Sequence, residues 1–158
     1  MIGNTVKKML LENESDFLIV ADNVATLSED NTLEHALLVL TNIGYSRIPV
    51  LNKQGQLMGQ ISLDQVVSQM FDIESLNPEK LDSMTVGEVM DRQACSIQMP
   101  FNIEKILNQL VDFNFVPVVD KQDVFLGIVT RKEILKSVNY LAHELESQYE
   151  LVELFEQD

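Results

Sequence analysis

The sequence predicts an α/β fold built from one unit that occurs twice, and two observations carry this prediction. First, RIPVLNKQGQLMGQIS (Arg47–Ser62) and FVPVVDKQDVFLGIVT (Phe115–Thr130) align without a gap at an offset of 68 residues. Second, each stretch combines strand-like apolar runs with helical patterns before and after it. A unit that cannot close its own core is expected to pack on its copy, leaving clefts related by approximate twofold symmetry.

The first unit is predicted to run strand, helix, strand, strand, helix. Its first helix has apolar residues at helical spacing, Asn31 or Thr32 as a cap, and Gly44 just after its end. A turn-rich tetrad, Asn52–Gly55, separates two short apolar runs and predicts a pair of strands. The predicted strands are Val24–Leu27, Arg47–Leu51 and Leu57–Ile61, and the second helix starts after Ser62.

The second unit is predicted to follow the same order. Its strands are expected at Ala94–Ile97, Phe115–Val119 and Val124–Val129, with the last helix beginning at Arg131. Two residues are missing between its first helix and second strand, where IGYSR of the first unit faces a shorter FNF turn. The two units are therefore not expected to be functionally identical.

Two further segments lie outside the repeated stretches. Polar residues and Pro78 predict a linker over Asp72–Asp82, followed by a short helical turn in TVGEVM. An apolar stripe with interspersed glutamates runs from Leu135 to Phe155 and predicts a long amphipathic helix. Such a helix needs a surface to cover its apolar side. Either it folds back on its own domain, or it helps to build a homodimer.

Composition excludes several classes of protein. A chain of 158 residues fits one compact domain, and its net charge of -14 argues against nonspecific binding to nucleic acid. No apolar run approaches the ~20 residues of a membrane span, and the start is not a signal peptide, so we expect a cytoplasmic protein without membrane contact. Cys95 is the single cysteine and there are two histidines, which leaves no disulfide or metal-ligand pattern. No catalytic triad, Cys/His pair or phosphate-binding loop is present, so we expect no enzyme and no cofactor.

The doubled pattern of a Pro-Val strand, a polar turn, a Gly-x-x-Ser/Thr strand end and a helix resembles the CBS motif pair, or Bateman module. The motifs are VAT, GYSRIPVLN and GQIS in the first unit, and TVGEVM, ACSI, FVPVVD and GIVTRKE in the second. The resemblance implies tandem CBS motifs (β-α-β-β-α units) with helical extensions at both ends. The implied segments are an N-terminal helix (1–14), CBS motif 1 (15–71), a linker (72–83), CBS motif 2 (84–139) and an acidic amphipathic C-terminal helix (140–158).

The same resemblance implies two clefts that commonly hold adenosine-containing ligands, each built from both units. The first would combine Asn23, Val24, Ala25, Tyr45, Ser46, Arg47, Ile48 and Pro49 with Thr130, Arg131 and Lys132. The second would combine Ala94, Cys95, Phe115, Val116 and Pro117 with Ser62, Leu63 and Asp64.

Charge distinguishes the two expected clefts. Arg47, Arg131 and Lys132 are expected to meet in the first, beside a helix N-terminus that favours phosphate. The second has no cation among its expected residues and holds Asp64. Arg131 and Lys132 are alternatively ordinary solvated residues of a first helical turn. Tyr45 either stacks on an exposed second adenine or packs the end of its helix.

One residue of the family pattern is missing here, and its absence bears on which ligand is expected. The family usually has an Asp three residues after the Ser/Thr to bind a ribose diol, and this chain has Gln65 and Glu133 instead. AMP, ADP or ATP is therefore less favoured, although Glu133 can partly substitute. In a cyclic dinucleotide the ribose 3′ oxygens are already esterified, so no free ribose diol needs to be bound. Its two phosphates would suit the predicted basic residues.

The whole chain resembles the stand-alone cyclic di-AMP-binding CBS proteins of Gram-positive bacteria. This resemblance implies a non-catalytic sensor that binds cyclic di-AMP and regulates a partner, such as a (p)ppGpp synthetase/hydrolase or pyruvate carboxylase. The alternatives are a sensor of AMP, ADP or ATP and an interaction module whose clefts stay empty.

Overall fold

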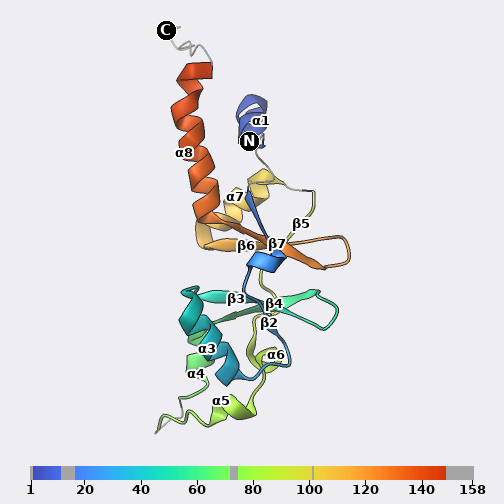
Figure 1. The fold of residues 1–158 in the computed structure, drawn as a ribbon, viewed down its shortest axis with the longest axis vertical. Helices are drawn as coiled ribbons and strands as arrows, with labels where there is room; N and C mark the ends of the chain where they lie inside the picture. The colour runs from blue at the N-terminus through green and yellow to red at the C-terminus, as the bar shows by residue number, and fades with distance from the viewer. Residues whose placement is uncertain (1, 12–16, 72–74, 101, 149–158) are drawn as a thin grey trace, which may run out of the picture.

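The structure is a computed structural model that describes residues 2–11, 17–71, 75–100 and 102–148. Two β-sheets lie one above the other at the middle of an elongated molecule, with helices toward both ends (Figure 1). One sheet has the strand order β2-β3-β4, comprising β2 (Leu27–Ser28), β3 (Arg47–Leu51) and β4 (Leu57–Ser62). The other has the order β1-β7-β6-β5, comprising β1 (Leu18–Val20), β5 (Ile97–Gln98), β6 (Phe115–Val119) and β7 (Phe125–Thr130).

The helices divide between the two ends. Next to the first sheet are the helices α3 (Leu33–Ile43), α4 (Leu63–Ser68), α5 (Lys80–Ser83) and α6 (Val86–Val89). The 3-10 turn η1 (Ala21–Asn23) lies at the middle of the molecule, against β7. At the opposite end are α1 (Asn4–Leu11), α7 (Ile103–Asp112) and α8 (Arg131–Gln148). The rest of the expected C-terminal helix, 149–158, lies outside the described residues. No helix in the described ranges is long and apolar enough to cross a membrane.

Local sequence signals place α3 as predicted. Thr32 is the N-cap, because its hydroxyl accepts a hydrogen bond from the amide of His35. Gly44 ends the helix in the left-handed conformation with φ of 71°, which costs glycine no steric penalty. The predicted bounds of β3 and β6 are also confirmed.

The first strand of each unit was predicted too early in the sequence. Val24–Thr26 is not a strand, and β2 begins only at Leu27, whose parallel pairing is with Val50. Val24 instead packs on the apolar cluster between the sheets. In the second unit the strand likewise begins at Ile97 rather than Ala94. Parallel pairing with the next strand is thus confined to two residues in each unit.

Each unit contributes a segment to the sheet of the other. The strand β1 pairs antiparallel with β7, with Val20 opposite Gly127. In the opposite direction, Asp91 leads into the second unit and bridges to Gln60 of β4 through two backbone hydrogen bonds of 3.0 and 2.8 Å. A Cβ atom at Gly59 or Gly127 would collide with the crossing backbone, at Asp91 and Ile19 respectively. The glycine at these equivalent positions therefore allows a segment of the other unit to pair with each sheet.

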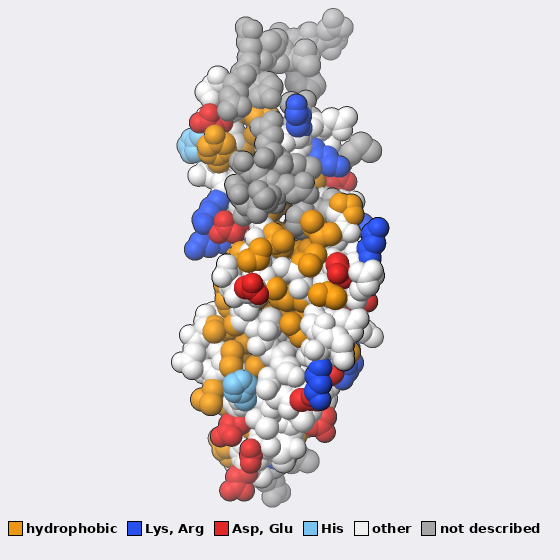
Figure 2. Space-filling view, turned by 45° about the vertical axis from the view of Figure 1, so that its right-hand side comes forward, with side chains coloured by type: hydrophobic (Ala, Val, Ile, Leu, Met, Phe, Trp, Pro, Cys, Tyr) orange, Lys and Arg blue, Asp and Glu red, His pale blue; other side chains and the backbone are white. Residues whose placement is uncertain are grey.

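The two hairpin turns also meet, and they do so symmetrically. The amide of Leu57 donates to the carbonyl of Asp123, and the amide of Phe125 donates to the carbonyl of Gly55, both at 2.9 Å. Gly55 and Asp123 stand at equivalent positions of the repeat and both have positive φ, 76° and 62°. On the face carrying these turns, hydrophobic side chains gather over the middle of the molecule, while Lys and Arg stand in small separate groups (Figure 2).

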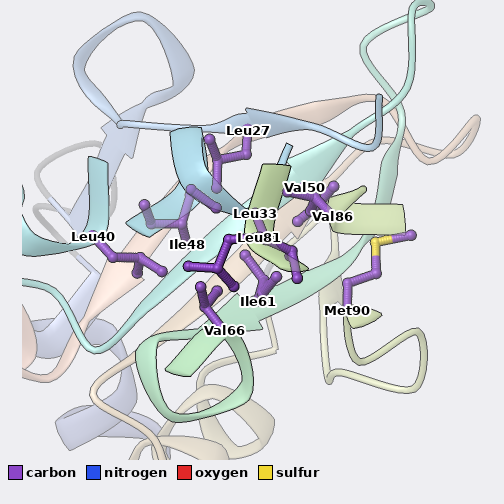
Figure 3. Close-up of a cluster of buried hydrophobic side chains, with 11 residues drawn as sticks. Leu27, Leu33, Leu40, Ile48, Val50, Ile61, Val66, Leu81, Val86 and Met90 are labelled. Atoms are coloured by element: carbon purple, nitrogen blue, oxygen red, sulfur yellow. The ribbon is translucent and has the colours of Figure 1, made fainter. Parts of the chain in front are cut away.

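Two large apolar clusters fill the units, and residues from the predicted linker help to complete one of them. The first cluster draws on β2, α3, β3, β4 and α4 of the first unit, and also on Leu81 of α5, Val86 of α6 and Met90 (Figure 3). Leu81 is only 3% exposed. An apolar residue of the segment predicted as a linker is thus buried in the first core.

Candidate functional site

A cavity of about 750 Å³ opens where the start of α8 faces the end of α3. Its wall combines Tyr45 of the first unit with the start of β6, the end of β7 and the exposed side of α8's first turns. The lining residues are Ile19, Tyr45, Asn114, Phe115, Thr130, Arg131, Lys132, Glu133, Leu135, Lys136 and Asn139. Of the predicted site residues, the cavity brings together Tyr45, Thr130, Arg131 and Lys132.

The N-terminus of α8 presents hydrogen-bond donors to this cavity. Thr130 caps the helix, since its hydroxyl accepts from the amide of Glu133 at 3.2 Å. The amide of Arg131 donates to the carbonyl of Asn114 at 2.8 Å. The amide of Lys132 has no acceptor within the described part of the chain. This free amide and the positive end of the helix dipole together favour binding of an anion.

Positive charge at the cavity comes from Lys132 and Lys136, which lie one turn apart on α8. Lys136 was not predicted, although its four-residue spacing from Lys132 could have indicated it. Its ammonium group lies 2.8 Å from a carboxylate oxygen of Glu133. Glu133 thus lines the cavity where the family's ribose-binding acid is expected, but it already has a cationic partner.

Arg131 lines the cavity, and its guanidinium is hydrogen-bonded to the C-terminal end of α7. Its Nε donates to the carbonyl of Leu110 at 2.7 Å. One of its terminal nitrogens donates to the carbonyls of Val111 and Phe113 at 3.1 and 3.2 Å. Neither interpretation made from the sequence, a phosphate ligand or a solvated first-turn residue, describes this arrangement.

Two aromatic rings form one side of the cavity. Tyr45 and Phe115 meet edge to face, with ring centroids 6.5 Å apart and an interplanar angle of 69°. Tyr45 is 46% exposed, which leaves much of its ring accessible, whereas Phe115 is buried. Phe115 was expected in the second cleft. It lies on the boundary between the two, lining the cavity and the neighbouring depressions alike.

Arg47 does not join the cations of the cavity, contrary to the expectation from the sequence. It lines two smaller depressions of about 60 and 160 Å³, with its guanidinium carbon 5.9 Å from the ring centroid of Phe113. The reason lies in the register: Arg47 pairs with Ser62 in one sheet, as Phe115 pairs with Thr130 in the other. Arg47 thus takes the place in the second cleft that Phe115 takes in the first.

The remaining predicted residues have other surroundings. Ser46 lines the larger depression beside Arg47. Ile48 belongs to the first apolar core, Val24 packs between the sheets, and Pro49 is buried within β3. Asn23, Val24, Ala25, Ile48 and Pro49 are not among the residues that line the cavity.

The second cleft has Arg47 as a cation, but an acidic residue stands at its helix start. Ala94, Cys95 and Val116 line its smaller depression as expected. Ser62 and Gln65 form a closed capping box at the start of α4, which uses the first-turn amide of Gln65. A hydrogen bond from Ser62, aided by the nearby charge of Arg47, lowers the pKa of Asp64. The ionised Asp64 would repel a phosphate at this helix start.

The fold and paired clefts define the class of protein. The CBS domain family matches residues 15–72 and 86–140, so the chain belongs to the CBS-domain family, and the predicted tandem arrangement is confirmed. Cyclic di-AMP receptor B of Bacillus subtilis (strain 168) is 38% identical over 139 residues, spanning 88% of this chain and 95% of that protein.

Solved structures agree with this assignment. CbpB from Streptococcus agalactiae has a TM-score of 0.85 at 28% identity, covering 96% of this chain and 95% of that one. The CbpB protein of Listeria monocytogenes in complex with c-di-AMP has a TM-score of 0.75 at 42% identity, covering 82% of this chain and 96% of that one. The described residues contain no group of three or more His, Cys, Asp or Glu that could hold a metal ion.

Proposed function

We propose that this chain is a non-catalytic sensor that binds cyclic di-AMP in the cavity at the start of α8. The observation that carries the proposal is the combination of Lys132, Lys136 and the capped helix N-terminus on one side with Tyr45 and Phe115 on the other. Cations and helix amides suit phosphates, and aromatic rings suit adenine. The relatives described as a cyclic di-AMP receptor and as a c-di-AMP complex support the same ligand.

The cavity has room for a ligand larger than one nucleotide. The pairing of its carboxylate, Glu133, favours a cyclic dinucleotide over a mononucleotide. Its volume of about 750 Å³ lies toward the upper end of ordinary ligand pockets. Glu133, the residue available for a free ribose diol, is paired with Lys136 at 2.8 Å. A mononucleotide would have to compete for this carboxylate, whereas a cyclic dinucleotide with esterified 3′ oxygens has less need of it.

Isothermal titration calorimetry with cyclic di-AMP, AMP, ADP and ATP tests the proposal. We expect Lys132→Met and Lys136→Met each to weaken cyclic di-AMP binding about tenfold, as expected for loss of one charge-assisted contact. Lys53→Met is the matched control, because Lys53 is exposed on a hairpin turn and paired with Asp30 at 3.4 Å.

Other outcomes separate the alternatives. Binding of mononucleotides alone would identify an adenosine nucleotide sensor instead. No binding by any of the four, with the protein folded, would favour an interaction module. Equal weakening by Lys53→Met would mean that net charge, rather than the cavity, decides affinity.

We further propose that the ligand controls association with a partner protein, and that the chain acts in the cytoplasm as a homodimer. A ligand changes partner affinity only by its own difference in affinity between the two states of the sensor. Surface immobilisation of the chain, with a (p)ppGpp synthetase/hydrolase and pyruvate carboxylase passed over it with and without cyclic di-AMP, tests the first part. Identical binding of both proteins in both conditions would reject regulation of these partners.

A further inference from the structure

Three hydrogen bonds fix the Arg131 side chain on the last turn of α7. They run to the carbonyls of Leu110, Val111 and Phe113, at 2.7, 3.1 and 3.2 Å. Carbonyls at a helix C-terminus lack partners within the helix, and a cation there interacts favourably with the helix dipole. The guanidinium therefore closes the end of α7 with its Nε and one of its two terminal nitrogens, which use three of its five N–H donors.

The main chain of Arg131 makes a fourth link to the same segment. Its amide donates to the carbonyl of Asn114 at 2.8 Å. Arg131 is also the first residue of α8. One residue thus fixes the start of α8 relative to the end of α7, and the wall formed by Asn114 and Phe115 lies between these two helix ends.

Two lysines near Arg131 on α8 carry positive charge at the cavity. Lys132 and Lys136 line the cavity on consecutive turns of α8, and their orientation depends on where the first turn of that helix begins. A small rotation or shift of this turn would move both ammonium groups and the Lys132 amide together. Binding sites lose much of their affinity when their supporting residues are removed.

We propose that Arg131 is a positioning residue of the nucleotide site rather than a phosphate ligand, an inference that rests on the proposed function. It holds the first turn of α8 against α7, so that Lys132 and Lys136 meet the phosphates. The sequence alone suggested the opposite role, because adjacent basic residues at a helix start look alike until their side-chain directions are seen.

Three substitutions separate positioning from direct contact. Arg131→Gln removes the charge but places an N–H donor where Nε stands, within reach of the Leu110 carbonyl. Arg131→Met has a similar length and removes both charge and donor. Arg131→Lys keeps the charge but has a methylene where Nε stands. Circular dichroism verifies folding, and calorimetry with cyclic di-AMP at two salt concentrations measures affinity and its salt dependence.

We expect Arg131→Met to bind about tenfold more weakly than wild type and Arg131→Gln to recover a clear part of this loss. The salt dependence should stay close to that of wild type in both, while Lys132→Met reduces it more, because an ion pair with the phosphate contributes most to the attraction that salt screens. Amide hydrogen exchange, measured without ligand, should be faster at residues 131–133 in Arg131→Met than in Arg131→Gln.

Two results overturn the inference. One is wild-type affinity in Arg131→Lys together with equal weakening in the Gln and Met variants and a reduced salt dependence, which identifies a direct charge contact. The other is unchanged affinity in all three variants. Both require that wild type binds cyclic di-AMP. If wild type binds none of the nucleotides, the proposed function fails and the inference fails with it.

Discussion

Among single residues, Gly59 and Gly127 have the same structural role at equivalent positions of the repeat. Each lies where the backbone of the other unit crosses its strand, at Asp91 and Ile19 respectively. The obstacle is main chain rather than a flexible side chain, so it cannot turn aside. Glycine is required here by the closeness of two backbones, which the repeat alone could not reveal.

Replacing either glycine by alanine should therefore destabilise the whole molecule. We expect Gly59→Ala and Gly127→Ala each to lower the free energy of unfolding by about 3 kcal/mol, the upper range for overpacking. Urea unfolding followed by circular dichroism measures the change. Gly3→Ala is the control, because a Cβ there would meet no atom within 4 Å. A loss below that of the control at both positions would contradict the crossing arrangement.

Local sequence signals were sufficient to predict some secondary-structure elements but not others. The strands β3 and β6 were predicted at their observed bounds because β-branched runs end at turn residues on both sides. The strand β1 was missed, since its three residues are strand only through pairing with β7. The short α5 was missed because burial of Leu81 in a distant core, rather than local propensity, holds it.

The candidate site was predicted in part for the same physical reason. Thr130, Arg131 and Lys132 follow directly from a strand end and a helix start, which are local features. Arg47 was assigned to the wrong cleft because its side depends on how the two sheets stack. Lys136 was overlooked, although helical spacing from Lys132 places it on the same face.

The short helix α6 offers a pH test of one capping box. The amide and hydroxyl of Thr85 donate to Glu88, at 2.7 and 3.0 Å, and these bonds lower the pKa of Glu88. A carboxyl with a lowered pKa in the folded state stabilises the protein above its unfolded pKa, and this contribution disappears as the pH falls through the folded pKa.

We therefore expect Glu88→Gln to be less stable than wild type at pH 7, with the difference shrinking as the pH falls below about 4.3, the usual glutamate pKa. Urea unfolding at a series of pH values between neutral and acidic measures both proteins. Glu34→Gln, which alters an exposed glutamate in the first turn of α3, is the control. A difference that stays constant across this pH range would argue against a contribution from the ionised capping box.

In the whole molecule, neither unit is complete on its own side of the linker. The first core needs Leu81 from the linker and Val86 and Met90 from beyond it, and the sheet of the second unit needs β1 from before it. The symmetry of the repeat is therefore a symmetry of exchange rather than of two independent halves.

Cutting the chain within the linker tests this interdependence. We expect fragments 1–76 and 77–158 to show no cooperative thermal transition separately, and to regain one when mixed at equal concentration. Differential scanning calorimetry of each fragment and of the mixture is the measurement. A cooperative transition in either isolated fragment would mean that this unit closes its own core.

The pairing of β1 with β7 also constrains how the chain is made. Leu18 leaves the ribosome well before its partner Val129, which lies far along the chain. Until then an apolar strand remains without its neighbour, and contacts so distant in sequence form slowly. The nascent chain therefore exposes a strand that can pair with other chains until β7 has been synthesised, and a chaperone that shields residues 17–20 would protect the protein during that interval.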